Sequence, residues 1–509
     1  MKKTLLFIMV AALSAAVSAK MCYTVEIDTV GKYLNVKMQY TATEKGRQTV
    51  ELRMPVWAPG YYDILNYPKY LTDFRATKTN GDELQWRKER KSTWIVETGG
   101  ADTILVSYRV YANVMDVANS RITADGAFIA TNGVLMYEDG HKEEPVTTSY
   151  IVPSNWQHAS SGLKPDANAT NPYTYTAEDF DVLYDSPLLF GNHLVDKFEY
   201  DGHEYEFALQ PGTNYAETTF KEDFKAMVSA CTEMMKDVPY DNYCAIIMEG
   251  RGGGLEHLNS QADYSNGNLK FENREDYVRF LDFIAHEYFH LYNVKRIRPI
   301  ELGPFDYSQE AFTPLLWFSE GFTSYYSAQL LRRGNLIDAE TMLGIYSRYI
   351  HDIEIYEGHR HMSLRQSSYD IWLDFLGDNS NYRAVAISYY NKGAYMGLLF
   401  DAKLRCVTNG KRSLDDFMLL LYNRYYKELK RGFTEEEFWA ALGEVAGETK
   451  EATEAVALLR RYVDTTDAID YDALLNPVGI EIDHDTWKMS LVPKPSKQAH
   501  RLRKALVGE

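Results

Sequence analysis

The chain has few cysteines and no excess of positive charge, and these deficits exclude several classes of protein. Its 509 residues include four cysteines, too few for a disulfide-based scaffold. Buried free thiols, or one bridge such as Cys231 to Cys244, remain open. Asp and Glu number 72 against 54 Lys and Arg, so a formal charge of −18 repels phosphate backbones. With no repeat or low-complexity tract, the sequence argues against a nucleic-acid-binding protein, a fibre and a solenoid.

Long apolar runs are also scarce, and the one at the N-terminus has the features of a secretory signal. Two lysines precede an apolar run at 5–17, and small residues lead up to Ala19. We expect 1–19 to be a signal peptide and the protein to be periplasmic or secreted. Lipid anchoring through Cys22 is disfavoured, because Met21 stands where a small residue is needed. No later run reaches the roughly 18 apolar residues of a membrane helix.

Residues 20–210 carry the two-residue alternation of half-buried strands. Apolar and polar residues alternate over 34–40, 50–56 and 104–110. The segment KFEYDGHEYEFAL is typical of a hairpin that turns at Asp201-Gly202. We therefore predict an N-terminal all-β domain of the sandwich type.

Residues 211–476 change to the helical period. After an apolar stripe at 224–235, a strand at 243–248 and the turn RGGG, the spacing is mainly helical. RGGG is not a phosphate loop, because no Gly-Lys-Ser/Thr follows it. Residues 477–509 are basic and contain only short runs of regular apolar spacing, which predicts a strand or two and a loose tail. The sequence thus predicts a multidomain α+β protein.

A metal-binding pattern lies in the helical part, in LDFIAHEYFHLYN. His286 and His290 are four residues apart, so on a helix both imidazoles project from one face and can bind a single Zn²⁺. Glu287 lies beside them as a base for the metal's water. Asn273 is a plausible N-cap of this helix, and Pro299 lies past its end. The alternative is two surface histidines on an ordinary helix.

Two imidazoles leave a catalytic zinc short of one protein ligand, and TPLLWFSEGFTSYY supplies a candidate. Thr313 can cap the helix and Pro314 suits its first position, which places Glu320 in the second turn. A carboxylate among so many aromatic residues is costly to bury unless it meets a positive charge. We therefore predict Glu320 as the third ligand.

These motifs together resemble the glycyl aminopeptidase family of gluzincin metallopeptidases. The resemblance rests on HEYFH followed by NVKRIRP, on LWFSEGFTSYY, on MPVWAPGYY at 54–62 and on ISYYNKG at 387–393. It covers residues 22–480 and implies a thermolysin-like, mainly α-helical zinc peptidase domain. Many members carry a PDZ domain after the catalytic region. Only about 30 residues follow Pro477 here, too few for such a domain, so we expect none.

The resemblance implies His286, His290 and Glu320 as zinc ligands and Glu287 as the general base. It adds a loop containing Gly253, Gly254 and Glu256, which is similar to the one that holds the substrate's free α-amine in related aminopeptidases. It also adds Tyr390, with Tyr389 as the alternative, as the donor to the oxyanion. The expected enzyme binds one Zn²⁺ per chain and peptide substrates with a free N-terminus, and it releases Gly or Ala.

Two other functions remain open, a zinc endopeptidase and a non-catalytic zinc-containing binding protein. Glu287 argues against the second, since a structural site has no use for a base beside the metal. Lys295, Arg296 and Arg298 follow the metal-binding helix, and we interpret them as cations that interact with the helix dipole rather than with substrate. The sequence does not indicate an oligomeric state.

Overall fold

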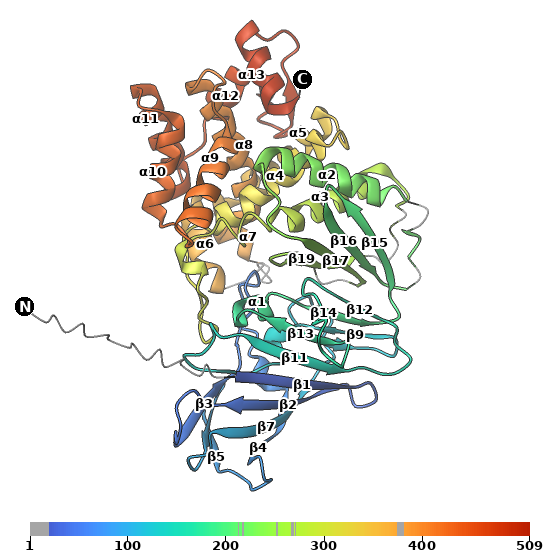
Figure 1. Cartoon of the computed structure of the whole chain (residues 1–509). Helices are drawn as coiled ribbons and strands as arrows, with labels where there is room; N and C mark the ends of the chain where they lie inside the picture. The colour runs from blue at the N-terminus through green and yellow to red at the C-terminus, as the bar shows by residue number, and fades with distance from the viewer. Residues whose placement is uncertain are drawn as a thin grey trace, which may run out of the picture.

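The structure is a computed structural model that describes residues 20–211, 213–215, 218–250, 253–265, 269, 271–373 and 381–508. The predicted signal peptide, 1–19, lies outside these residues. Figure 1 shows a β domain, formed by the N-terminal part of the chain, packed against a mainly helical domain formed by the rest. This arrangement confirms the predicted fold class.

Three sheets build the β domain, in the strand orders β13-β11-β1-β2-β7-β4, β10-β3-β6-β5 and β12-β14-β9-β8. The strands of the first sheet are β1 (Lys20–Asp28), β2 (Tyr33–Thr41), β4 (Leu71–Lys78), β7 (Thr103–Tyr111), β11 (Val146–Ile151) and β13 (Thr174–Ala177). Those of the other two are β3 (Thr49–Arg53), β5 (Trp86–Arg90), β6 (Thr93–Glu97), β8 (Arg121–Ile122), β9 (Gly126–Ile129), β10 (Tyr137–Glu138), β12 (His158–Ser161) and β14 (Leu188–Gly191). The apolar positions of the alternating segments are buried in one shared core, as expected of packed sheets.

A further group of strands corrects the expected domain boundary. The hairpin at Asp201-Gly202 forms as β15 (Leu194–Tyr200) and β16 (His203–Leu209), but β16 pairs in parallel with β17 (Asn242–Glu249). The sheet continues through β19 (Ser260–Ser265) to β18 (Gly254–Glu256) at its edge. The hairpin therefore belongs to the second domain. Alternation alone cannot tell which sheet a strand joins.

This sheet lies between the two domains and is buried on both faces. Ala245 and Ile247 of β17 pack into the core under the helices, whereas Ile246 and Met248 pack against the β domain with Leu189. Figure 1 shows the same arrangement, with β17 and β19 between the helices and the strands β9, β12 and β14. The position of this sheet thus depends on both domains.

The helical domain is built around the central helix α8. Its helices are α2 (Phe220–Met235), α3 (Arg274–Phe289), α4 (Thr323–Arg333), α5 (Ala339–Glu354), α6 (Leu364–Tyr369), α7 (Tyr382–Val385), α8 (Tyr389–Val407), α9 (Leu414–Leu421), α10 (Glu435–Ala446), α11 (Lys450–Asp464) and α12 (Tyr471–Leu475). One short helix, α1 (Phe180–Tyr184), lies in the β domain. Within the described helices, none is both long and apolar enough to cross a membrane.

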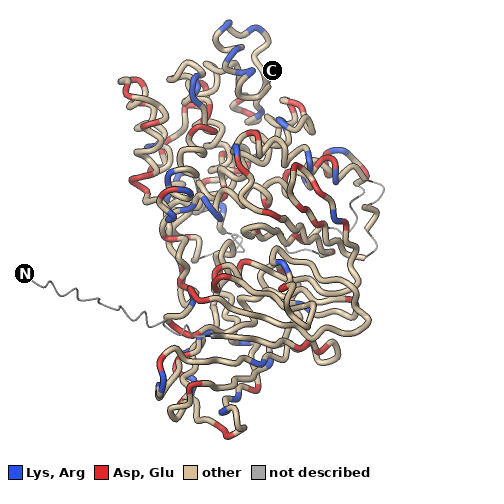
Figure 2. The backbone as a smooth tube through the Cα atoms, in the orientation of Figure 1, with Lys and Arg blue, Asp and Glu red and all other residues tan. Residues whose placement is uncertain are grey.

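The C-terminal segment is ordered, contrary to the loose tail expected from its basic composition. Strands β20 (Ile480–Ile482) and β21 (Met489–Leu491) pair, and α13 (Lys497–Val507) follows. Leu502 and Leu506 are buried and lie four residues apart on one face, while Lys497, Arg501 and Lys504 are exposed. Figure 2 shows Lys and Arg positions along the chain near the C-terminus. The helical spacing was present in the sequence but sparse.

Candidate metal centre and active site

Helix α3 presents the two histidines as the sequence predicts. Asn273 caps the helix, and its side chain accepts the N–H of Asp276. Leu281 and Ile284 bury the opposite side of the helix in the core. His286 and His290 therefore project toward the edge of the sheet, and their Nε2 atoms lie 3.0 Å apart.

Glu320 meets both imidazoles. Its Oε2 lies 3.4 Å from Nε2 of His286 and 3.1 Å from Nε2 of His290. Glu320 is in a π-helical turn (Trp317–Phe322) that leads into α4, and not in the regular α-helix predicted to start at Thr313. Such turns widen the helix and change the direction of a side chain, and they recur at functional sites.

The tautomer of His290 leaves its Nε2 atom free to bind a cation. Nδ1 of His290 donates to the carbonyl of Asn293 at 2.7 Å, so Nε2 carries a lone pair when the ring is neutral. Nδ1 of His286 contacts Oγ of Ser324 at 3.1 Å. The lone pair of His290, Nε2 of His286 and a carboxylate oxygen thus converge on one point, an arrangement that a cation at that point would stabilise. Two imidazoles and one carboxylate are the donor set of a catalytic zinc.

The electrostatics of Glu320 agree with this interpretation. Burial alone would raise the pKa of this carboxyl, but His290 and His286 lower it to about 2. Glu320 is therefore a carboxylate at neutral pH, although it is 2% exposed. The aromatic surroundings noted in the sequence are tolerated because the charge is paired.

Glu287 lies in a pocket that favours its protonated form. It is buried and faces Gly254 so closely that a Cβ at residue 254 would stand 2.4 Å from Oε1 of Glu287. Burial, and then the nearby carboxyl of Asp263, raise the pKa of Glu287 well above its usual value. A carboxylate in this position has a strong affinity for a proton.

Glu256 ends the edge strand β18 next to the same centre. Oxygens of Glu256 and Glu287 and a ring nitrogen of His290 lie within 4.8 Å of one another. Gly254 pairs with Asp263 across the strands, and Gly253 before it has a φ of 72°, a conformation that favours glycine. The glycine-rich segment therefore lets the edge strand pass close to the site.

The two candidate tyrosines differ in exposure. Both begin α8, whose N-cap Ser388 accepts the N–H of Asn391. The ring of Tyr390 is partly exposed and lies 6.1 Å from the ring of His286, whereas Tyr389 is buried behind it. Burial, and then Glu320, raise the pKa of Tyr390, so its hydroxyl keeps its proton.

The structure adds residues to the site that were not predicted from the sequence. The hydroxyl of Tyr62 donates to Oε1 of Glu320 at 3.5 Å, and Gly60 covers the carboxylate of Glu256. Both belong to the segment MPVWAPGYY, which was used from the sequence only as evidence of the family resemblance. Asp185 also reaches the site from the β domain, through Lys295. No local pattern connects residues so far apart in sequence.

The cations after α3 correct the helix-dipole interpretation in part. Arg296 does donate to a carbonyl at the helix end, that of Leu291, at 2.7 Å. Lys295 instead is buried between Asp185 and Glu256. Arg298 lies over the ring of Phe305 and lines a cavity of about 200 Å³ together with Lys295 and Glu256. Lys295 is thus part of the site.

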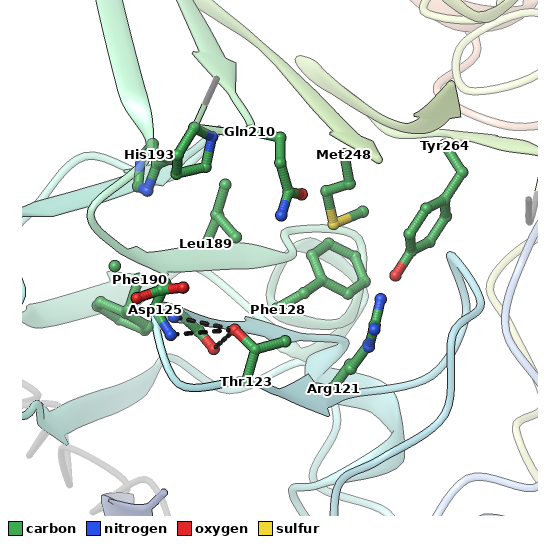
Figure 3. Close-up of a pocket in the computed structure, with 13 residues that line it drawn as sticks. Arg121, Thr123, Asp125, Phe128, Leu189, Phe190, His193, Gln210, Met248 and Tyr264 are labelled. Atoms are coloured by element: carbon green, nitrogen blue, oxygen red, sulfur yellow. Dashed lines mark hydrogen bonds between the residues drawn. The ribbon is translucent and has the colours of Figure 1, made fainter. Parts of the chain in front are cut away.

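A different cavity, shown in Figure 3, lies at the domain junction between Phe128 and Leu189 of the β domain and Met248 of β17. The hydrogen bonds drawn there are those of a turn, in which Oγ1 of Thr123 accepts the N–H groups of residues 125 and 126 and donates to the carbonyl of Gly126. The lining of this cavity includes none of the predicted site residues. We assign no activity to it.

Two family models match the chain. The Peptidase M61 N-terminal domain matches residues 22–192, and the M61 glycyl aminopeptidase model matches residues 279–396. The first match ends just before β15, where the structure places the boundary between the sheets. The second contains the histidines, Glu320 and Tyr390. A comparison with curated proteins gave no match.

Solved structures share the fold. An aminopeptidase N family protein from Idiomarina loihiensis is 24% identical with a TM-score of 0.84, covering 91% of this chain and 79% of that chain. An M1 zinc metallopeptidase from Deinococcus radiodurans is 13% identical with a TM-score of 0.55, covering 89% and 94%. Native yeast LTA4 hydrolase is 12% identical with a TM-score of 0.52, covering 94% and 69%. From the matches to both family models, the chain belongs to the M61 glycyl aminopeptidase family and is a metallo-aminopeptidase.

Proposed function

We propose that the protein is a zinc aminopeptidase that hydrolyses the first peptide bond of peptides with a free N-terminus. The convergence of His286, His290 and Glu320 beside Glu287 and Glu256 carries this proposal. A mutant of the similar zinc metallopeptidase from Deinococcus radiodurans was solved with a bound Tyr-Ser-Ala substrate. That relative supports a peptide as the substrate class.

The three convergent residues would hold one zinc ion per chain. When bound, zinc polarises the scissile carbonyl and lowers the pKa of a water molecule to about 7. Glu287 takes the proton of the attacking water and passes it to the leaving amine, in keeping with its high proton affinity. Tyr390 then donates a hydrogen bond to the oxyanion, since its hydroxyl stays protonated and its ring lies beside His286. Tyr389 is too buried to replace it.

Glu256 would bind the substrate's α-ammonium and so restrict cleavage to the first bond. Its place at the end of the edge strand β18 supports this role, because a peptide lying along that strand would bring its N-terminus there. The backbone of Gly253 and Gly254 would then face the substrate. Gly or Ala would be the released residue, and the description of the matched family as a glycyl aminopeptidase supports glycine.

We also propose that the protein acts in the periplasm or outside the cell. The signal-like segment supports this location. Strand β1 begins at Lys20, which pairs with Thr41, so cleavage after Ala19 would leave the sheet intact. N-terminal sequencing of protein from the exported fraction should start at residue 20. A cytoplasmic protein that starts at Met1 would contradict the export proposal.

The decisive experiment compares matched peptides with free and acetylated N-termini, with and without a zinc chelator. The expected result is zinc-dependent release of the first residue from free peptides only, because acetylation removes the charge that Glu256 binds. Cleavage of acetylated peptides at internal bonds at the same rate would instead indicate an endopeptidase. Activity that survives full removal of the metal would contradict the zinc site.

A further inference from the structure

A buried chain of three charges crosses the boundary between the two domains. Nζ of Lys295 lies 2.9 Å from Oδ1 of Asp185 and 3.5 Å from Oε1 of Glu256. The side chains of Lys295 and Glu256 are 6% and 4% exposed, and that of Asp185 is 15% exposed. Asp185 follows helix α1 in the β domain, whereas the other two belong to the catalytic domain. The β domain therefore supplies one member of the cluster.

Asp185 is held in place by bonds other than the one to Lys295. Its Oδ2 accepts the backbone N–H of Leu258 at 2.7 Å, and its Oδ1 lies 3.0 Å from Nδ1 of His257. Both partners directly follow Glu256 in the chain. Asp185 thus binds the segment that carries Glu256 as well as the ammonium beside it.

Lys295 is closer to Asp185 than to Glu256. Burial lowers the pKa of Lys295, but Asp185 and then Glu256 raise it above its usual value, so it is charged at neutral pH. Oε1 of Glu256 is buried and makes no hydrogen bond of normal geometry within the described residues. The carboxylate of Glu256 is therefore only partly satisfied by Lys295.

We propose that Asp185 and Lys295 are positioning residues that set the charge of the amine anchor, so that Glu256 keeps one net negative charge for one substrate ammonium. Within the three-residue cluster, two carboxylates and one ammonium leave a net charge of −1. This inference rests on the proposed function, because it assumes that Glu256 binds the α-ammonium. It assigns the β domain a direct part in substrate selection.

The charge count predicts that a second substitution, at Lys295, reverses the effect of the first, at Asp185. In Asp185→Asn, Lys295 loses its closer partner and pairs fully with Glu256, so the anchor becomes neutral and binds an ammonium poorly. In Asp185→Asn/Lys295→Met, both the carboxylate and its competing ammonium are removed, and the net charge returns to −1. A purely structural role predicts changes in stability in both variants, while the ratio of the analogue's Ki to the peptide's KM stays at its wild-type value.

The test uses a free-amine peptide as substrate and its desamino analogue, which lacks only the amine, as a competitive inhibitor. In the wild type the KM of the peptide should lie well below the Ki of the analogue. Asp185→Asn should raise this KM at least about tenfold, leave the Ki within about threefold, and change kcat little. The double variant should restore a KM within about threefold of the wild type. Asp415→Asn, which breaks the ion pair with Arg333 between α9 and α4, is the matched control and should leave the KM unchanged.

Two results would overturn the inference while leaving the proposed function in place. One is an unchanged ratio of Ki to KM in Asp185→Asn, and the other is a double variant that fails to recover. If the wild type binds both compounds equally, the amine anchor itself is wrong and both proposals fail. If Asp185→Asn does not fold, the double variant decides alone, because removal of a whole buried pair is tolerated better than removal of one partner. It must then keep the wild-type ratio, and loss of the ratio would overturn the inference.

Discussion

Gly60 of the β domain lies against Glu256 so closely that a Cβ at residue 60 would stand 2.5 Å from Oε1 and 2.7 Å from Oε2. The loop that carries Gly60 also carries Tyr62, whose hydroxyl reaches Glu320. One β-domain loop therefore touches both the candidate amine anchor and a candidate metal ligand. The two domains build the site together.

Gly60→Ala should displace the carboxylate of Glu256 and raise the KM for free-amine peptides about tenfold or more. Gly81→Ala is the matched control, because Gly81 has nearly the same φ, 94° against 91°, but nothing lies within 4 Å of its Cβ. Both variants should lose about 1–2 kcal/mol of stability from the left-handed conformation. Equal KM values in the two variants would show that Gly60 does not shape the anchor.

Glu320→Ala should remove most of the bound zinc. The variant leaves two imidazoles, and a metal with two protein ligands is held far more weakly. Elemental analysis of the purified variant after dialysis measures the loss. A full complement of zinc in this variant would remove Glu320 from the set of ligands.

Ser324→Ala should weaken the metal by a smaller factor, about 10–100-fold in affinity, because Oγ of Ser324 orients His286 through Nδ1. Ser327→Ala, one turn further along α4, is the control, since its Oγ bonds to Asp282 and not to a histidine. Competition with a chromogenic zinc chelator measures both affinities. The same affinity in the two variants would exclude the orienting role.

Glu287→Gln should reduce kcat at least about a hundredfold while zinc content and folding stay intact. The amide keeps the shape of the side chain but cannot accept the proton of water. Single-turnover kinetics with a free-amine peptide and a parallel zinc assay test the two parts. Turnover close to that of the wild type would contradict the role of Glu287 as the base.

Asp282→Asn should stabilise the protein at high pH and not at low pH. Burial raises the pKa of Asp282 to about 6, although the Ser327 hydroxyl opposes the shift. The wild-type protein therefore loses stability as pH rises from the unfolded pKa of about 3.9 through 6, because folding then buries a charge. The variant lacks this loss, so its Tm should exceed that of the wild type at pH 8 and approach it at pH 4. Asp241→Asn, at an exposed position, is the control for the general effect of an Asp-to-Asn substitution.

The two candidate histidine ligands and the candidate base could be predicted from sequence because their spacing is local. His286 and His290 share a helix face at any i, i+4 separation, and Asn273 marks where that helix begins. Glu320 could be predicted as a ligand because burying a carboxylate among the aromatic residues of a helix costs free energy unless a positive charge lies beside it. Even there the sequence did not indicate the π-helical turn, which packs against α8.

The rest of the site was decided by tertiary structure. Asp185 and Lys295 are 110 residues apart in sequence. From the sequence, Lys295 was interpreted only as a cation at a helix end, and no pattern pointed to Asp185. Alternation predicted the hairpin at 201–202 but not the sheet that it joins, because an edge strand can pair with any neighbour of the right register. A residue pattern specifies the local conformation and the buried face of a segment. Which segments meet, and so which charge lies beside Glu256, is determined by the packing of two domains against one shared sheet.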